Sequence, residues 1–412
     1  MSHLLVTAKQ HIEINTALAG YLKKNGYLNS FKAFLAEADL QNENVDSNAA
    51  TLERKFLTNA RLQVKVTNLE KQLAELQADA CRDGPARTNR KPDEWLPRAP
   101  ERGTLIGHRM SINRVIFHPI YTLIVSGSDD ASIRIWDVLT GRCERALTGH
   151  TNAVNDLAFN AKGNQLLSCS SDMTAKLWDF GQTYSCLRSF AGHDHSITTV
   201  AFTADNMFLT GSRDSLIKLW EPETARCIHN FRGHEDWVRM IRLNSSSKYL
   251  ASCSTDRAVK VWSMESKNLI VDLFGHDHVV ECIAWASEAT VKAMKISVDK
   301  EADVLIEGPP LVLASAGRDR SIRVWHVNIG ACLFIIDGHD NWVRGLVFHP
   351  LGNYLISVAD DKTMRTWDMD NQKQIKSILP HNQFVSGVDF HKTEPYVVTC
   401  SADSTLKLWE CR

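Results

Sequence analysis

The sequence predicts an all-β propeller of seven blades, preceded by an α-helical N-terminal region. Three observations favour this fold. One segment, represented by residues 149–179, recurs seven times, at a spacing of 42 residues with one gap of 63. Each copy holds short runs with strand composition, such as VNDLAF, QLLSCS and TAKLW, which are separated by turn residues. Runs this short cannot bury a face alone, so they must pair with one another and with neighbouring copies.

Four positions keep fixed offsets in every copy. Each copy opens with a His, usually preceded by Gly, and closes with a Trp; an Asp lies six residues before this Trp and a Ser or Thr lies ten before it. The His residues are His108, His150, His193, His234, His276, His339 and His381. The Asp residues are Asp130, Asp172, Asp214, Asp256, Asp319, Asp361 and Asp403. The Ser or Thr residues are Ser126, Ser168, Thr210, Ser252, Ser315, Ser357 and Thr399. The Trp residues are Trp136, Trp178, Trp220, Trp262, Trp325, Trp367 and Trp409. This repeat resembles the WD-repeat family, which implies a seven-bladed WD-repeat propeller over residues 103–412.

The fixed positions have a structural interpretation. The Asp is expected in a tight turn, where its carboxylate can accept hydrogen bonds from backbone amides. The His of the same blade can donate to that carboxylate, and the Ser or Thr hydroxyl and the Trp N–H can extend the chain of hydrogen bonds. A Ser-His-Asp catalytic set is the alternative. Because a catalytic site is normally unique and this set occurs seven times, the structural role is favoured.

Residues 7–40 are expected to form a hairpin of two short helices. Apolar residues recur at three- and four-residue spacing from Ile14 to Leu22, Asn25-Gly26 is a helix stop, and a second helix is predicted from about residue 29 to 38. Two such helices need a partner to bury their apolar faces. The segment resembles the LisH motif at Leu18, Tyr21, Leu22, Gly26, Tyr27, Ser30, Phe34 and Glu37. The resemblance implies a homodimer; a hairpin packed on its own propeller is the alternative.

Residues 52–80 have the heptad pattern of a coiled coil. Leu occupies the d positions, and the a positions hold a β-branched residue and one Asn, a combination that favours a parallel two-stranded coil. The expected dimerisation residues are Leu62, Val66, Leu69, Leu73 and Leu76. A solvated single helix is the alternative. Residues 81–102 hold four Pro residues and are expected to be a linker, either solvated or in contact with an acidic surface.

Two features of the propeller segment depart from the simple repeat. The last copy ends three residues after its Trp, so it has no room for a fourth strand. Residues 103–106 precede the first Gly-His and are predicted to supply that strand, which closes the ring and removes a free edge. The fifth copy has about 21 extra residues around positions 287–310, predicted as an insertion between its first and second strands. The insertion is either a tolerated surface loop or a partner contact.

The residues beside the His and Asp positions form a candidate docking surface. Since these two groups are expected to bond, both must lie on one face of the propeller. On that face, blades three to six carry a series of basic and aromatic residues, here called the arc. The arc consists of Arg213, Trp237, Arg239, Arg318, Arg320, Trp342, Arg344 and Lys362. Arg and Trp are enriched at protein interfaces, so the arc is predicted to dock on an acidic surface. Scattered solvated charges are the alternative.

The order of LisH motif, coiled coil, linker and seven blades, with stretches such as GHEDWVRMIR, GHDNWVRG and FHKTEPYVVT, is similar to the lissencephaly family of cytoplasmic dynein regulators. The resemblance implies a homodimeric, non-enzymatic regulator of microtubule-based transport, nuclear positioning and mitosis. It implies a location in the cytoplasm, on the cytoskeleton, and at centrosomes and spindle microtubules. It implies that the dynein heavy chain motor domain binds at Arg213, Arg239, Arg318, Trp342 and Lys362. The other residues of the arc, Trp237, Arg320 and Arg344, are candidate additional contacts on the same face from the repeat register alone. It also implies NudE-type coiled-coil adaptors and the catalytic subunits of platelet-activating factor acetylhydrolase as partners.

Composition and motifs disfavour other classes. The net charge of −1 gives no global attraction to nucleic acid or membranes, and no run is long enough to span a bilayer. The ten Cys residues have no zinc-ligand spacing, so no metal or cofactor is expected, and the absence of a signal peptide favours cytosol or nucleus. No nucleophile elbow or P-loop indicates an enzyme. A substrate receptor or scaffold of a ubiquitin ligase remains an alternative, because other LisH and WD-repeat proteins serve there. Receptors of the cullin type often carry Arg two residues after Trp-Asp, where this chain has Leu139, Gly181 and Asp370.

Overall fold

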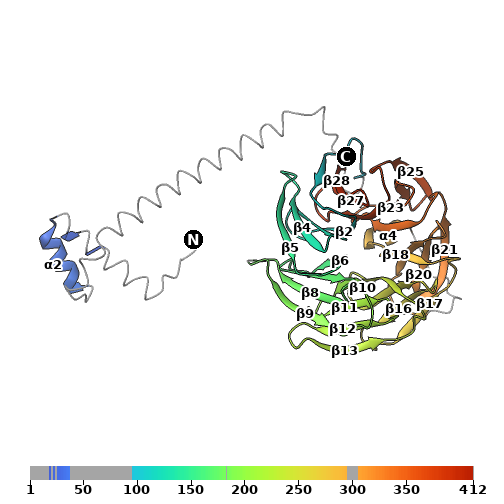
Figure 1. The fold of residues 1–412 in the computed structure, drawn as a ribbon, viewed down its shortest axis with the longest axis horizontal. Helices are drawn as coiled ribbons and strands as arrows, with labels where there is room; N and C mark the ends of the chain where they lie inside the picture. The colour runs from blue at the N-terminus through green and yellow to red at the C-terminus, as the bar shows by residue number, and fades with distance from the viewer. Residues whose placement is uncertain are drawn as a thin grey trace. The chain divides into compact units, whose positions relative to one another are not determined.

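The computed structural model describes residues 18–19, 22–23, 26–37, 95–181, 183–294 and 305–411. The chain separates into two compact units, residues 1–87 and 88–412. The second unit contains seven four-stranded antiparallel sheets that surround a central axis like blades, so the predicted seven-bladed propeller is confirmed (Figure 1). In each blade the first strand lies innermost and the fourth strand lies at the rim (Figure 1).

The first four blades follow the chain in order. Blade one consists of β2 (Ile112–Phe117), β3 (Leu123–Ser128), β4 (Ser132–Asp137) and β5 (Cys143–Thr148). Blade two consists of β6 (Val154–Phe159), β7 (Gln165–Ser170), β8 (Thr174–Asp179) and β9 (Cys186–Ala191). Blade three consists of β10 (Ile197–Phe202), β11 (Phe208–Ser212), β12 (Ile217–Glu221) and β13 (Arg226–Phe231). Blade four consists of β14 (Val238–Leu243), β15 (Tyr249–Ser254), β16 (Val259–Ser263) and β17 (Leu269–Leu273).

The last three blades contain the irregular features. Blade five consists of β18 (Val280–Trp285), β19 (Val312–Gly317), β20 (Ile322–His326) and β21 (Ala331–Ile336), with the short 3-10 helix η3 (Val327–Ile329) before β21. Blade six consists of β22 (Val343–Phe348), β23 (Tyr354–Ala359), β24 (Met364–Asp368) and β25 (Lys373–Ile378). Blade seven consists of β26 (Val385–Phe390), β27 (Tyr396–Ser401), β28 (Thr405–Glu410) and β1 (Gly103–Ile106).

The hydrophobic core lies between neighbouring blades. One cluster joins Leu167 and Leu177 of blade two to Val200 and Phe208 of blade three, and six similar clusters occur around the ring of described residues. The second strands are therefore almost wholly buried, whereas the rim strand β9 exposes all but one of its residues. Each blade buries its faces only against its neighbours, so the ring must close to have no exposed apolar face.

The predicted closure is confirmed. β1 pairs antiparallel with β28, with Gly103 opposite Leu408 and Ile106 opposite Thr405. The residues before this strand also pack on blade seven. Pro97 forms an isolated bridge with Cys411, and Trp95 packs against the apolar cluster between blades six and seven. Residues 95–102, expected as the end of the linker, thus contact the propeller in this structure.

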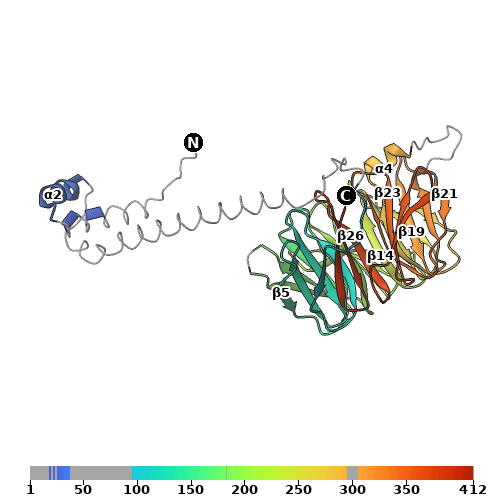
Figure 2. The ribbon, with the colours of Figure 1, turned by 90° about the horizontal axis from the view of Figure 1, so that it is seen from above.

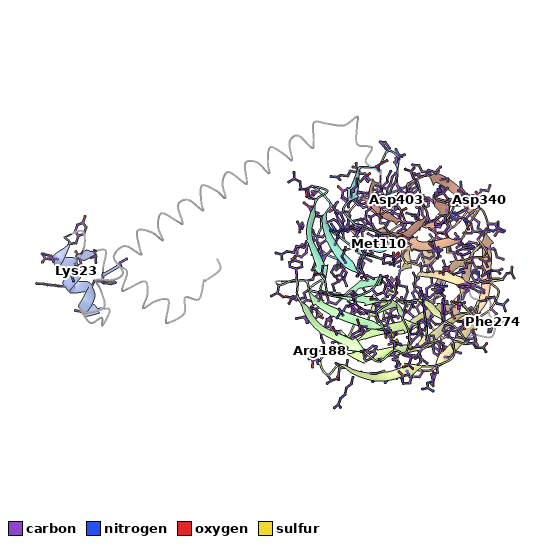
Figure 3. All side chains as sticks on the ribbon, in the orientation of Figure 1. Lys23, Met110, Arg188, Phe274, Asp340 and Asp403 are labelled. Atoms are coloured by element: carbon purple, nitrogen blue, oxygen red, sulfur yellow. The ribbon has the colours of Figure 1, made fainter. Side chains whose placement is uncertain are left out.

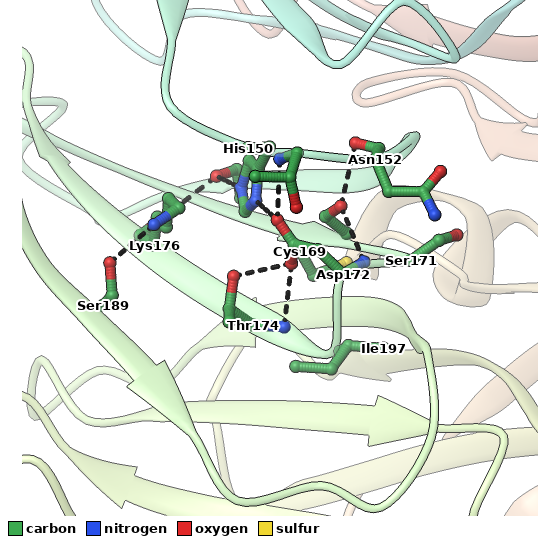
Figure 4. Close-up of polar contacts among 12 residues, drawn as sticks. His150, Asn152, Cys169, Ser171, Asp172, Thr174, Lys176, Ser189 and Ile197 are labelled. Carbon is green, nitrogen blue, oxygen red and sulfur yellow. Dashed lines mark hydrogen bonds and ion pairs between the residues drawn. The ribbon is translucent and has the colours of Figure 1, made fainter.

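Hydrogen bonds join the four fixed positions in each blade. In blade two, His150 Nδ1 lies 2.8 Å from Asp172 Oδ2, and His150 Nε2 lies 2.7 Å from Ser168 Oγ (Figure 4). Trp178 Nε1 donates to the same hydroxyl at 2.8 Å. The same three contacts recur in all seven blades, with distances between 2.6 and 3.1 Å. They link the loop before the first strand to the turn between the second and third strands.

The turn that holds each Asp has a constrained backbone. The residue after every turn Asp has a positive φ although none is glycine: Ala131, Met173, Ser215, Arg257, Arg320, Lys362 and Ser404, with φ between 62° and 68°. This left-handed conformation is costly for residues with a Cβ. The Asp carboxylate compensates by accepting backbone amide bonds, such as those from Thr151 and Thr174 to Asp172 at 3.1 and 2.9 Å.

The insertion in blade five contains a short helix, α4 (Glu288–Ala293), that the sequence analysis did not predict. It follows β18 and precedes β19, so the predicted position between the first and second strands is correct. Ser287 caps it by accepting from the Thr290 amide, and the Thr290 hydroxyl donates to Gly352 O of blade six at 3.0 Å. Loops between first and second strands lie at the opposite ends from the His and Asp loops, and Figure 2 shows α4 at one face of the propeller.

The N-terminal unit contains α2 (Leu28–Glu37), close to the predicted second helix. Gly26, at φ 79°, lies where the helix stop was predicted, and the Tyr27 amide donates to Leu22 O at 3.0 Å. In this unit Tyr27 and Leu28 are 57% and 60% exposed. The predicted coiled coil of residues 52–80, with its dimerisation residues, lies outside the described part of the chain.

The nine cysteines in the described part of the chain are free thiols. Cys169, Cys253 and Cys400 are buried in second strands, where burial raises the pKa of each thiol. Cysteines in the fourth strands, such as Cys143 and Cys227, are instead exposed, so packing explains only the buried set.

The closing strand gives a first prediction. Removal of residues 1–106 deletes β1 and should lower the midpoint of thermal unfolding and promote aggregation, because β28 becomes an unpaired edge. Removal of residues 1–94 keeps β1 and the contacts of Trp95 and Pro97, so this variant should unfold at the temperature of the full chain. Differential scanning calorimetry of the three proteins is the measurement. Equal midpoints for the two truncated proteins would contradict a closing role for β1.

A second prediction concerns pH. Burial lowers the pKa of His150 below its ordinary value of 6.5. Burial alone would raise the pKa of Asp172, but hydrogen bonds from Thr174 and His150 outweigh it and lower this pKa below 3.8. Both groups bind protons more readily in the unfolded chain, so their stabilisation is complete above the unfolded pKa and is lost as pH falls. Similar directions hold at His108, His381, Asp130, Asp214, Asp256, Asp319, Asp361 and Asp403.

The midpoint of thermal unfolding should therefore be nearly constant from pH 8 to 7, fall below about pH 6.5 and fall more steeply below about pH 4. A scan of thermal unfolding by circular dichroism at half-unit pH steps measures it. A midpoint that rises between pH 7 and pH 5 would be inconsistent with this assignment.

Candidate protein-interaction surface

The loops that carry the seven His residues lead from the rim of the propeller to its centre. Figure 3 illustrates their two ends: Phe274, which follows the rim strand β17, lies at the edge of the ring, and Met110, just before the inner strand β2, lies toward its centre. Residues that follow the His therefore surround the central opening. The face that carries the His loops and the Asp turns is called the His face below. A cavity of about 330 Å³ opens there, lined by residues of all seven blades.

Two clusters of the same design lie on this face. In the first, Arg213 of blade three stacks on Trp237 of blade four, with the guanidinium carbon 4.6 Å from the ring centroid. Arg239, two residues after this Trp, lies 5.5 Å from the same ring. We name these three residues the blade three–four cluster. Cation–π contacts of this kind hold an Arg side chain in place and keep its charge available.

The second cluster repeats the arrangement two blades further on. Arg318 of blade five stacks on Trp342 of blade six at 4.2 Å, and Arg344 lies 5.1 Å from the same ring. We name these three residues the blade five–six cluster. Six of the eight residues of the arc are thus brought together in two groups.

Glu281 of blade five joins the clusters, and the sequence analysis missed it. Its side chain is only 7% exposed, and Oε1 accepts a hydrogen bond from Arg318 Nε at 2.6 Å. Oε2 lies 3.7 Å from both Arg239 and Arg344. A buried carboxylate needs such partners, because an unpaired buried charge is costly. Glu281 is the second residue of the first strand of its blade, as Arg239 and Arg344 are in theirs. This shared offset was a signal that could have identified it.

Asp360 supplies a second acid. It directly precedes the turn Asp of blade six, and its carboxylate accepts from Arg344 Nε at 3.0 Å and from Nη2 at 2.9 Å. Burial alone would lower the pKa of Arg344, but the hydrogen bond to Asp360 and the charge of Glu281 raise it. The pKa of Arg239 is instead lowered, by burial and by the neighbouring arginines despite Glu281. Nearby carboxylates therefore stabilise the charged guanidinium of Arg344, in the blade five–six cluster, more than that of Arg239, in the blade three–four cluster.

The remaining arc residues lie in the Asp turns. Arg320 and Lys362 follow the turn Asp of blades five and six and are exposed. Arg257 occupies the same position in blade four and is also exposed, although the sequence analysis did not select it. Blades four to six thus present one exposed cation each at the same position of the turn.

The aromatic series also continues beyond the arc. Phe384 of blade seven occupies the position of Trp237 and Trp342, directly before the first strand, and is 47% exposed. It lines the same cavity as Arg213 and Arg239. Its equivalence to the two Trp residues was visible in the repeat register. The surface therefore has a basic sector on blades three to six and an aromatic edge on blade seven.

The part of the chain that the structure describes holds no cluster of three or more His, Cys, Asp or Glu side chains that could bind a metal ion. Among the same residues, no helix is both long and apolar enough to cross a membrane. The seven His-Asp-Ser/Thr sets are occupied by the hydrogen bonds described above.

The comparisons with known proteins agree with this architecture. The model of the WD domain, G-beta repeat, matches the chain seven times, at residues 100–137, 141–179, 184–221, 225–263, 267–326, 330–368 and 372–410. The chain is 46% identical to the lissencephaly-1 homologue of Caenorhabditis briggsae over 357 residues, which cover 86% of each chain. It is 35% identical to the nuclear distribution protein PAC1 of Arthroderma otae, over 86% of this chain and 82% of that protein.

A second PAC1 protein, that of Coccidioides posadasii, is 36% identical over 87% of this chain and 80% of its own length. These alignments cover much more than the repeats' fixed positions, and they extend over most of both chains. The repeats, the seven-bladed fold and the similarity over most of the chain lead to one conclusion. The chain belongs to the WD-repeat family that contains the lissencephaly-1 homologue and the nuclear distribution protein PAC1.

Proposed function

We propose that this protein is a homodimeric, non-enzymatic regulator of cytoplasmic dynein that binds the motor domain through the arc. Membership of the lissencephaly-1 and PAC1 family supports a role in nuclear distribution. The dynein motor domain, as the partner, follows from the resemblance at Arg213, Arg239, Arg318, Trp342 and Lys362. Trp237, Arg320 and Arg344 are proposed as additional contacts.

The observation that carries the proposal is the pair of Arg-Trp clusters on the His face. Four arginines and only two acids, Glu281 and Asp360, make up the clusters and their partners, so a net charge of +2 remains there. This charge belongs to a chain whose overall net charge is −1, so the basic character is local. Arg and Trp supply paired hydrogen bonds and a large rigid apolar area, which suit an acidic protein surface.

The proposed dimer depends on the N-terminal unit. Tyr27 and Leu28, at the start of α2, are more than half exposed within a single chain, and Leu18 is 39% exposed. Exposed apolar residues on a short helix favour burial against a second copy. We propose residues 7–40 as a LisH motif, residues 52–80 as a parallel coiled coil and residues 81–94 as the linker to the propeller.

The proposed cellular setting follows from the family. The protein is proposed to act in the cytoplasm, on the cytoskeleton, and at centrosomes and spindle microtubules, in microtubule-based transport, nuclear positioning and mitosis. NudE-type adaptors and the catalytic subunits of platelet-activating factor acetylhydrolase are proposed as further partners. The arc lies on the His face, whereas the insertion with α4 lies on the opposite face, so the two can serve different partners.

The third prediction tests the arc. Simultaneous change of Arg213, Arg239, Arg318, Trp342 and Lys362 to Ala should nearly abolish binding of the purified dynein motor domain. Single changes in such clusters typically cost about 1–2 kcal/mol or more, and each 1.4 kcal/mol is roughly tenfold in affinity. Biolayer interferometry at several salt concentrations is the measurement, and binding by the parent protein should weaken as salt rises.

Two controls make this experiment specific. Loss of Arg239 and Arg318 leaves Glu281 with fewer partners, which can cost about 1–3 kcal/mol of stability. The double variant Arg213→Ala with Lys362→Ala keeps the ion pairs of Glu281 and should still bind at least tenfold more weakly. A matched variant removes four exposed cations from the ends of the strands opposite the His face: Arg142, Lys162, Lys373 and Lys392 to Ala. If this variant and the folded double variant bind the motor equally well, the motor site lies elsewhere.

The fourth prediction concerns the dimer. Multi-angle light scattering of the full chain should give about twice the monomer mass of 46.3 kDa, and residues 90–412 should be monomeric. The reason is that the exposed apolar residues and the heptads both lie before residue 90. A monomeric full chain at micromolar concentration would refute the proposed dimer.

A further inference from the structure

The two Arg-Trp clusters differ in one respect, although their cationic and aromatic parts are equivalent. Each cluster has an Arg directly before the turn Asp of one blade, a Trp directly before the first strand of the next blade, and an Arg two residues later. Because the blades repeat, every other residue of one cluster has a counterpart in the other. The two clusters therefore differ only at the positions where equivalent residues are not the same.

The acids of the blade five–six cluster are replaced by threonines in the blade three–four cluster. Glu281, at the second position of strand β18 in blade five, corresponds to Thr198 in strand β10 of blade three. Asp360, directly before the turn Asp of blade six, corresponds to Thr255 directly before the turn Asp of blade four. Arg239 Nε donates to Thr255 Oγ1 at 3.3 Å, which matches the bond from Arg344 Nε to Asp360 Oδ1 at 3.0 Å. The geometry is retained, but the negative charge is absent.

The arginines of the two clusters differ accordingly. Arg318 has a carboxylate oxygen at 2.6 Å, and Arg344 donates to both oxygens of Asp360. Arg239 has only a distant carboxylate, that of Glu281 at 3.7 Å. Among the residues that the structure describes, no carboxylate lies within ion-pairing distance of Arg213, and its buried Nε has no hydrogen-bond partner. The blade three–four cluster is thus deficient in negative charge.

The blade three–four cluster, which has few carboxylate partners, faces an open cavity. Thr198, Arg213 and Arg239 line the cavity of about 330 Å³ at the centre of the His face. Trp237, which holds both arginines, is 36% exposed. A side chain from a partner can therefore reach the Arg213 guanidinium without displacing an internal ion pair. At Arg239 it would compete only with the 3.7 Å contact to Glu281.

We propose that the blade three–four cluster is a binding site for two neighbouring carboxylates of an acidic protein segment. The blade five–six cluster is the internal copy of the occupied site, in which Glu281 and Asp360 take the places of the partner's acids. The inference rests on the proposed function in treating the arc as a docking surface, and it names the chemistry of the contact. One incoming carboxylate pairs with Arg213, as Glu281 pairs with Arg318. The other pairs with Arg239, as Asp360 pairs with Arg344.

The test places an internal acid in the open cluster. Thr255→Asp gives Arg239 the carboxylate that Arg344 already has, and Asp stands naturally at this position in blades one and six as Asp129 and Asp360. Thr255→Asn is the matched control, because it has the same shape without the charge. The probe is an acetylated hexaglutamate peptide with a fluorescent label, titrated at 50 mM salt and followed by fluorescence anisotropy. Thr255→Asp should bind it at least tenfold more weakly than the parent, and Thr255→Asn within about twofold of the parent.

A reciprocal variant makes the test independent of stability. Asp360→Thr copies blade four into blade six and frees Arg344, so it should bind the peptide several-fold more tightly than the parent, a gain that loss of folding cannot produce. The inference is overturned if the parent does not bind the peptide, if Thr255→Asp and Thr255→Asn bind it equally, or if Asp360→Thr shows no gain. Titration of the same proteins with the dynein motor domain separates the two proposals. Peptide binding with the expected order but no motor binding by the parent leaves the carboxylate site intact and refutes the dynein assignment.

Discussion

The hydrogen bond between the His and the turn Asp of each blade is the interaction on which the geometry of the His face depends. It joins two loops that are about 22 residues apart in sequence in most blades, such as His150 and Asp172 at 2.8 Å. The bonded Asp also stabilises a left-handed residue at every turn, so the turn has one geometry. Because the same bond recurs around the ring, the residues beside it are placed at equivalent positions on one face. The fold thereby offers seven equivalent places at which side chains can vary without a change in the backbone.

The arc is a variation of side chains at these places. Arginines and tryptophans occupy them in blades three to six, and smaller or acidic residues such as Asp129 and Ala402 occupy them in blades one and seven. Beside the arc, the buried Glu281 is shared among Arg239, Arg318 and Arg344; it holds these guanidinium groups in place and neutralises one of their positive charges. The arginines of the blade five–six cluster are thus held by more carboxylate contacts. The arginines of the blade three–four cluster keep more of their positive charge unpaired.

The sequence predicted the propeller, the closing strand and the position of the insertion, because each depends on offsets within a repeat. It could not predict that residues near Trp95 and Pro97 pack on blade seven, since these contacts join segments about 300 residues apart without any repeated pattern. Helix α4 was missed because six residues give no periodic signal and its stability comes from contact with Gly352. Glu281 was missed for a different reason: selection for basic and aromatic residues ignored the acid that positions them. Arg257 and Phe384 could have been found from their offsets alone.

The closing sheet has a mechanical consequence. β1 is the only strand of blade seven that comes from the N-terminal side of the ring, and it pairs with β28 at the other end of the chain. Any tension applied to the chain before residue 95 therefore enters the propeller at one seam. There it is resisted first by the contacts of Trp95 and Pro97, then by the ion pair of Lys407 with Glu101, and only then by the β1–β28 ladder. If the proposed dimer and the proposed partner at the His face pull in opposite directions, the load passes through this single sheet.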